Sequence, residues 1–168
     1  YLVYYKRVDT TSSNKNSGLV FAQMKSKNVE WRDADKLVLW VDNNLSFQNK
    51  ELVKVIEKSS KHKVKVISMT SSVELKSWLD TIAPHLKGRN FMIVTNRYRK
   101  NDGGDKAAHD LIKLVRGHKG WKSIPVVVFC ENIADARSLK KMKHTQVTDR
   151  SPDVLTWCSS LKKNPFKK

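Results

Sequence analysis

The residues whose types could do chemistry gather in one stretch, residues 90–104. An apolar segment there ends at Thr95, and the residues that follow hold a basic trio and an aspartate before glycine, namely Arg97, Arg99, Lys100 and Asp102-Gly103. The hydroxyl of Thr95 is neutral, so it lacks the charge with which a carboxylate attacks a phosphoryl donor and helps to hold Mg²⁺. The stretch therefore predicts attraction of anions without phosphoryl transfer.

The sequence lacks the other common motifs of enzymes and cofactor-binding proteins. It has neither a dinucleotide-binding glycine motif nor a Walker A motif, so nucleotide phosphates lack their usual cradle. Its five histidines and two cysteines are spread along the chain without metal-ligand spacing. We therefore expect no metal site, no cofactor and no enzymatic activity.

The two cysteines, Cys130 and Cys158, both lie in apolar segments. Such positions favour reduced thiols in the core of an intracellular protein, cytoplasmic or nuclear, over a disulfide scaffold. Cys130 also ends its apolar segment, which is where α/β folds place functional side chains. A buried structural thiol is the interpretation that we favour for it.

From residue 36 onward, short β-rich segments alternate with segments of helical periodicity. The strands are predicted at residues 36–42, 63–69, 90–94, 124–130 and 145–148. The helices are predicted at residues 46–58, 71–82, 106–116, 132–142 and 151–161, the second with a capping box and the last with an inner apolar stripe that includes Leu161. This order predicts a five-stranded parallel sheet with helices on both faces, a (βα)₅ three-layer sandwich.

The two ends of the chain do not fit this alternation. Residues 1–35 hold two extended apolar segments around a polar stretch, and they could form a β-hairpin, an N-terminal extension or a linker. Residues 36–163 are predicted to be the α/β domain, and residues 164–168 a basic tail. The chain begins with Tyr1, so we expect it to be part of a longer protein, and it has neither a transmembrane span nor a signal peptide.

Residues 36–163 resemble the receiver domain of response regulators, which has the CheY-like, flavodoxin-like fold. The resemblance rests on the (βα)₅ order and on three local matches: the first strand ending at Val41-Asp42-Asn43, the Asp102-Gly103 pair, and Pro125 opening an apolar fourth strand. In receivers, an aspartate at the end of the third strand accepts a phosphoryl group, and an Asp-Gly pair opens the next helix. The position of that acceptor is occupied by Thr95 in this sequence.

The resemblance implies a pocket whose chemistry is degenerate. Two acidic residues hold Mg²⁺ in receivers, whereas here Asp42 is followed by the neutral Asn43. The switching hydroxyl at the end of the fourth strand corresponds to Cys130, and the lysine after the fifth strand is approximated by Arg150. The resemblance therefore implies a pseudo-receiver that keeps the fold, binds Mg²⁺ poorly and is not phosphorylated.

The charge of the chain indicates an anionic partner. The 168 residues include 33 Lys+Arg against 16 Asp+Glu, which gives a formal net charge of +17. The basic residues concentrate in residues 58–65, 87–89, 97–100, 113–122 and 137–143 and in the C-terminal tail. Repulsion among these charges destabilises the folded chain unless an anion binds to it.

Two functions from different classes are compatible with this charge. The first is nucleic-acid binding through phosphates, with a basic and aromatic surface made of Arg97, Tyr98, Arg99, Lys100, Arg116, His118, Lys119 and Trp121. The second is a signalling or scaffold domain that docks an acidic protein segment. Tyr98 and Trp121 distinguish the two, because exposed rings beside arginines could stack on bases, whereas rings in the core would leave only sequence-independent charge.

Overall fold

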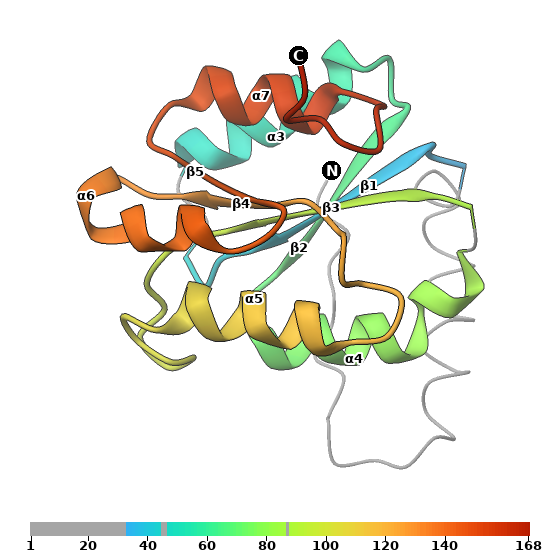
Figure 1. Cartoon of the computed structure of the whole chain (residues 1–168). Helices are drawn as coiled ribbons and strands as arrows, with labels where there is room; N and C mark the ends of the chain where they lie inside the picture. Colours follow the sequence, from blue (N-terminus) through green and yellow to red (C-terminus); the bar gives the residue numbers. More distant parts are fainter. Residues whose placement is uncertain (1–32, 45–46, 87) are drawn as a thin grey trace.

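The sheet is the centre of the fold (Figure 1). The computed structural model describes residues 33–44, 47–86 and 88–168. Five parallel strands form one sheet in the order β2-β1-β3-β4-β5, with the bounds β1 Lys36–Val41, β2 Val64–Met69, β3 Asn90–Thr95, β4 Val126–Phe129 and β5 Thr145–Thr148. This order is that of flavodoxin-like proteins and confirms the predicted fold class. The predicted N-terminal hairpin lies outside the described residues.

Helices cover both faces of the sheet, as predicted. Figure 1 shows α3 (Phe47–Ser59) and α7 (Ser151–Ser159) on one face, and α4 (Ser72–Thr81) and α5 (Ala107–Gly117) on the other. A short 3₁₀ helix, η1 (Ala83–His85), follows α4. The Ser71 hydroxyl caps α4 by accepting from the Glu74 N–H at 3.2 Å, whereas the Glu74 carboxylate accepts from the Thr70 N–H at 2.9 Å instead of closing the predicted capping box with the Ser71 N–H.

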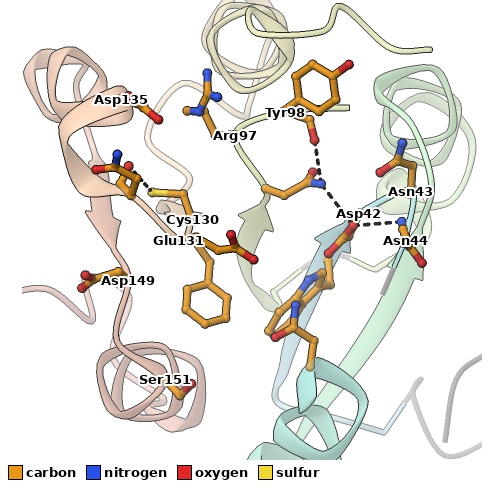
Figure 2. A pocket seen from close by; sticks show the side chains of 15 residues that line it. Asp42, Asn43, Asn44, Arg97, Tyr98, Cys130, Glu131, Asp135, Asp149 and Ser151 are labelled. Carbon is orange, nitrogen blue, oxygen red and sulfur yellow. Dashed lines mark hydrogen bonds between the residues drawn. The ribbon is translucent and has the colours of Figure 1, made fainter. Parts of the chain in front are cut away.

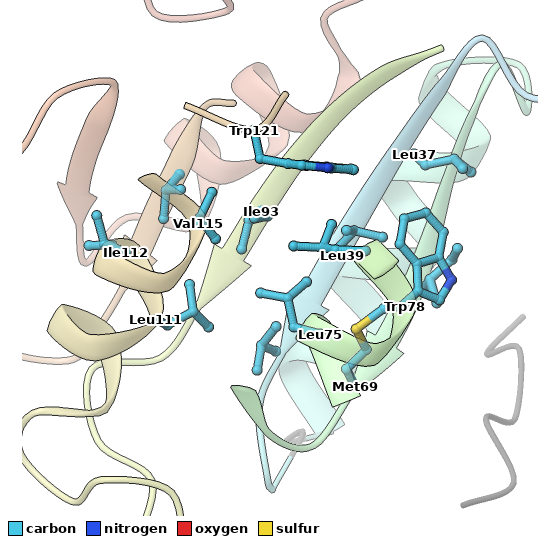
Figure 3. Close-up of a cluster of buried hydrophobic side chains, with 14 of the residues drawn as sticks. Leu37, Leu39, Met69, Leu75, Trp78, Ile93, Leu111, Ile112, Val115 and Trp121 are labelled. Carbon is cyan, nitrogen blue, oxygen red and sulfur yellow. The ribbon is translucent and has the colours of Figure 1, made fainter. Parts of the chain in front are cut away.

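The strands alternate their side chains between two apolar clusters, because successive residues of a strand point to opposite faces. Leu37, Leu39 and Ile93 pack towards α4 and α5, in the cluster drawn in Figure 3, whereas Val38 and Trp40 pack towards α3 and α7. Five apolar residues of the strands and of α5, which the sequence pattern predicts to be core, are at most 1% exposed: Trp40, Ile67, Ile93, Leu111 and Val127. Both faces of the sheet are therefore buried.

The predicted fourth helix is broken. Residues 132–142 form one α-helical turn, α6 (Ile133–Ala136), followed by a 3₁₀ helix, η2 (Arg137–Lys141). Its buried apolar residues, Ala136 and Leu139, are three residues apart. This spacing keeps side chains aligned on a 3₁₀ helix, which has three residues per turn.

The last helix ends earlier than predicted. Lys36 is buried at the start of β1, and its Nζ donates to the carbonyl oxygens of Trp157 at 2.8 Å and Ser160 at 2.7 Å. These bonds satisfy carbonyls that the end of a helix leaves without partners. Leu161 then lies beyond α7 and is 40% exposed, so its assignment to the inner stripe was wrong.

The stability of the fold should depend on pH through Lys36. Burial lowers the pKa of this lysine from 10.5 to about 8. Below pH 8 the Lys36 ammonium carries its proton in both the folded and the unfolded chain. The free-energy cost of burying this charge therefore does not change with pH. As the pH rises from 8 towards 10.5, the folded chain alone has released the proton, and the free energy of unfolding therefore increases.

Chemical denaturation of the wild type and of Lys36→Met at pH 7.5 and 9.5 measures this effect. We expect the wild type to gain about 2 kcal/mol relative to the variant over this interval. The comparison removes pH-dependent contributions that both proteins share. One of these comes from Cys158, because burial raises the pKa of its thiol to about 12. If the difference in the free energy of unfolding between the two proteins stayed constant with pH, the lowered pKa of Lys36 would be contradicted.

Candidate functional site

A cavity of about 600 Å³ lies at the carboxyl edge of the sheet, the edge at which the strands end. Figure 2 shows side chains from the ends of β1, β3, β4 and β5 around it. Four carboxylates and one guanidinium line this cavity: Asp42, Glu131, Asp135, Asp149 and Arg97. The acidic lining disfavours a phosphate, although the whole chain is strongly basic.

Asp42 lies in this cavity, as does Asn43. Its Oδ1 accepts from the Asn44 N–H at 3.0 Å and from the Asn96 Nδ2 at 3.1 Å. Burial raises the pKa of the Asp42 carboxyl, which the bond from Asn44 partly offsets. Within the described ranges, no cluster of three His, Cys, Asp or Glu side chains could hold a metal ion.

Thr95 does not face the cavity. Its side chain is buried on the α4 and α5 side of the sheet, and the residues that line the cavity do not include it. The Thr95 hydroxyl donates to the Asn96 carbonyl oxygen at 3.0 Å and accepts from the Arg99 guanidinium. Both hydrogen-bonding functions of the hydroxyl are therefore used inside the protein.

Arg99 is buried, with 0% of its surface exposed. Its Nε donates to Asp102 Oδ2 at 2.7 Å, and its Nη2 donates to the Ser72 hydroxyl at 3.0 Å and to the Ala107 carbonyl oxygen at 3.2 Å. One guanidinium thus joins the end of β3 to the first residues of α4 and α5. Its prediction as a surface residue was wrong, because these partners use its donors in the interior.

The Asp102-Gly103 pair is part of the same arrangement. Asp102 Oδ2 also accepts from the Ser72 N–H at 2.8 Å. Gly103 has φ of +94°, and a Cβ there would lie 3.3 Å from the Ala107 Cα. Glycine is therefore required for the turn that leads from Asp102 into α5.

Trp121 and Arg116 also make structural contacts, and the burial of Trp121 contradicts the exposed ring that base stacking would need. Trp121 is 7% exposed and packs on Phe91, with ring centroids 4.9 Å apart. Arg116 donates to three carbonyl oxygens, those of Ile124 at 2.8 Å, Lys143 at 2.9 Å and His144 at 3.1 Å. These contacts join two loops and use three of the five guanidinium N–H groups inside the protein.

The other predicted residues are at the surface but do not form one site. Tyr98 is 48% exposed and Lys100 is exposed, both after β3. Arg97 lines the cavity and pairs with Asp105 at 3.0 Å. Lys119 and His118 lie at the opposite edge of the sheet, before β4, where His118 Nε2 contacts Asp80 Oδ1 at 2.6 Å.

Cys130 and Arg150 keep the positions expected for the ends of β4 and β5. Cys130 lines the cavity, and its Sγ donates to the Asn132 carbonyl oxygen at 3.5 Å. Burial raises the pKa of the Cys130 thiol, which lowers its reactivity. Arg150 is exposed at the start of α7 and is not among the residues that line the cavity.

A second group of residues, which lies at the amino edge of the sheet, was not predicted as a site. The amino edge is the edge at which the strands begin, and the loops that lead into β2, β3, β4 and β5 form it together with the chain after α7. Nine exposed lysines lie there: Lys61, Lys63, Lys119, Lys122, Lys143, Lys162, Lys163, Lys167 and Lys168. We call this group the amino-edge lysines.

The chain after α7 belongs to this edge because its contacts fix it there. Lys36, the first residue of β1, bonds to the Ser160 carbonyl, and the Asn90 Nδ2 at the start of β3 donates to the Leu161 carbonyl oxygen at 2.9 Å. Phe166 packs edge-on against Trp157, with ring centroids 5.3 Å apart. The basic tail is thus attached to α7.

Among the described residues, the amino-edge lysines have no hydrogen-bonded or ion-pair partner for their ammonium groups. Two exposed lysines elsewhere do have such partners, Lys76 with Asp80 at 2.8 Å and Lys54 with Glu51 at 2.8 Å, whereas others, such as Lys100, have none within the described part of the chain. Two exposed carboxylates, Asp33 and Asp35, precede β1 at the same edge. The sequence signal for this group was present, because the basic segments other than 97–100 precede strands or follow the last helix.

The topology and these sites define a three-layer α/β protein of flavodoxin-like order, compatible with a CheY-like fold. Comparisons with protein-family models, with curated proteins and with solved structures find no match to this chain. No helix in the described part of the chain is long and apolar enough to span a membrane.

Proposed function

We propose that the chain is a catalytically inactive, receiver-like binding module that holds nucleic acid through phosphate contacts. The observation that carries the proposal is the gathering of the amino-edge lysines on one edge of a parallel sheet. A row of ammonium groups attracts the phosphates of a nucleic acid, and binding releases the counterions condensed on it.

Within the described ranges the amino-edge lysines have no partner for their ammonium groups, which supports a partner outside these residues. Lysines at random surface positions solvate a protein without needing a ligand. Here, however, the lysines of separate loops lie at one edge, where like charges repel one another, and two carboxylates, Asp33 and Asp35, accompany them. A bound polyanion removes that repulsion.

The carboxyl edge is less suited to a polyanion. Its cavity is lined by more carboxylates than cations, and Arg97 already pairs with Asp105. Arg99, which the sequence analysis assigned to a basic surface, donates its hydrogen bonds to partners inside the fold. We therefore assign nucleic-acid binding to the amino edge.

The inactive state follows from the position of Thr95. We expect no phosphorylation when the protein is incubated with acetyl phosphate and Mg²⁺, because a buried neutral hydroxyl stands where receivers carry an aspartate. Intact-mass measurement should show no adduct for the wild type. Thr95→Asp should also stay unmodified, because the Arg99 guanidinium beside it would pair with the new carboxylate.

A stoichiometric gain of one phosphoryl group by the wild-type loop would contradict the inactive assignment. Mapping by peptide fragmentation would show whether a gain lies within residues 90–104 or elsewhere. A gain in the Thr95→Asp variant alone would mean that Arg99 does not neutralise the site.

Binding itself is tested by fluorescence anisotropy with labelled oligonucleotides at about 50 and 150 mM salt. We expect the logarithm of the affinity to fall linearly with the logarithm of the salt concentration, with a slope of about −0.7 to −0.9 per phosphate contact. Because phosphates carry no base information, different sequences should bind alike. An absence of binding at about 50 mM salt would contradict the proposal.

An acidic protein segment is the competing partner, since carboxylates also attract lysines. A polyglutamate peptide in the same assay separates the two cases. Displacement of the oligonucleotide by an equal charge concentration of polyglutamate would favour the acidic-protein function.

A further inference from the structure

We infer that the preferred partner is a nucleic-acid duplex, which the amino-edge lysines grip by its phosphates alone across about six base pairs. This inference rests on the proposed function and adds the form of the nucleic acid and the size of the site. It depends on the order of the loops along the edge, on their rigidity and on the placement of the aromatic rings.

The lysine-bearing loops follow the strand order. Residues 61–63 lead into β2 at one side of the sheet, residues 118–122 lead into β4, and residues 143–144 lead into β5 at the other side. Neighbouring strands lie about 4.8 Å apart, so four intervals span about 19 Å. Since a duplex rises about 3.4 Å per base pair, this width matches about six base pairs.

The row is interrupted at β1. Asp33 and Asp35 precede this strand, between the loop before β2 and the loops before β3 and β4. The lysines therefore fall into two sets, Lys61 and Lys63 on one side, and Lys119, Lys122 and Lys143 on the other. A duplex has two phosphate strands separated by a groove, so two basic sets with a gap between them can contact both.

Hydrogen bonds hold these loops in place. The Arg116 guanidinium bonds to the carbonyl oxygens of Ile124, Lys143 and His144, which joins the loop before β4 to the loop before β5. Arg89 Nη1 donates to the Ala34 carbonyl oxygen at 2.6 Å, which joins the loop before β3 to the start of β1. Charges on fixed loops need less ordering when they meet a rigid duplex.

Among the described residues, the amino edge has no exposed Phe, Tyr or Trp ring, and its exposed rings are imidazoles, such as those of His62 and His144. Trp121, the ring nearest to these loops, is buried against Phe91. Tyr98 is the one aromatic residue among the exposed large hydrophobic side chains of the described part, and it lies at the carboxyl edge. Proteins that bind single strands stack bases on aromatic side chains, and this edge lacks the large exposed rings of Phe, Tyr or Trp for that purpose.

Without a large exposed ring for stacking, the charge density of the nucleic acid decides the preference. A duplex presents two phosphates per base-pair step, and each contact releases more counterion than a contact with a single strand does. With five contacts, slopes of −0.9 and −0.7 per contact give the duplex an advantage of about sevenfold at 0.15 M salt.

The test is anisotropy with a labelled 16-base-pair duplex and each of its strands, against the full chain. We expect the duplex to bind about sevenfold more tightly at 0.15 M salt, and duplexes shorter than about six base pairs to bind progressively less well. DNA and RNA duplexes of one sequence are measured in parallel, and a phosphate-only grip predicts comparable affinities.

Two double variants locate the contacts. Lys61→Glu with Lys63→Glu, and Lys119→Glu with Lys122→Glu, each remove two contacts and should lower duplex affinity about 30-fold at 0.15 M salt. The control is Lys100→Glu with Lys106→Glu, which makes the same charge change on exposed residues of the carboxyl edge. Screening should keep the control within about threefold of the wild type.

The outcomes separate this inference from the proposed function. Single strands that bind as tightly as the duplex would overturn the inference and leave nucleic-acid binding in place, as would an equal loss in the control variant. An absence of binding to duplex and single strands alike would overturn the proposed function as well. Circular dichroism spectra identical to that of the wild type confirm that each variant is folded.

Discussion

Replacing Arg99 with methionine should lower the free energy of unfolding by about 3–5 kcal/mol, because it leaves a half-buried carboxylate and two buried or half-buried hydroxyls without their shared partner. Asp102 would lose the Nε contact at 2.7 Å, and Ser72, Thr95 and Ala107 would each lose a donor. The end of β3 would no longer be joined to the starts of α4 and α5. Urea denaturation followed by tryptophan fluorescence measures the loss.

Lys100→Met is the matched control, because this neighbour is exposed and has no partner among the described residues. We expect it to change stability by no more than about 0.5 kcal/mol. Arg99→Lys should also destabilise, since an ammonium cannot reproduce the fork of a guanidinium. If Arg99→Met melts like Lys100→Met, the buried position of Arg99 is wrong.

Leu111→Ala and Ile93→Ala should each cost about 2–5 kcal/mol. Leu111 on α5 and Ile93 on β3 are fully buried in the cluster of Figure 3, between the sheet and the α4 and α5 layer. Truncation removes methyl groups and leaves a cavity that the surrounding side chains fill only in part. Thermal and urea melts measure the effect.

The exposed Val55, at 46%, supplies a control, because Val55→Ala on α3 removes methyl groups that water already contacts. We expect a change of no more than about 0.5 kcal/mol for this substitution. Melts of Ile93→Ala and Leu111→Ala that both match the wild type would contradict the assignment of the strand and the helix.

The fold could be predicted because its signals are local. Runs such as residues 36–41 and 126–129 are apolar on both faces, as strands buried between two helical layers must be, and the helices between them have apolar stripes. The errors fell where local signals conflict. Residues 132–142 have a three-residue apolar spacing that suits a 3₁₀ helix. The helix α7 ends where the Lys36 ammonium donates to the carbonyl oxygens at its end.

The site was harder to predict, because the burial of a basic residue depends on distant partners. Arg99 and Lys100 are neighbours in one basic stretch. Only Arg99 is buried, because its guanidinium bonds to Ser72 and Asp102. Likewise, nothing near Trp121 in the sequence indicates that Phe91 covers it. The amino-edge lysines were predictable in principle, since a parallel sheet brings all segments that precede strands to one edge.

The central claim is that the amino edge holds the nucleic acid. A titration of ¹⁵N-labelled protein with a short duplex, followed by amide chemical shifts, tests it most directly. We expect the shifts to concentrate at residues 61–63, 118–122, 143–144 and 162–163, while those of residues 96–106 and 130–132 at the carboxyl edge stay unchanged. Shifts confined to the carboxyl edge, around the cavity of Asp42 and Arg97, would contradict it.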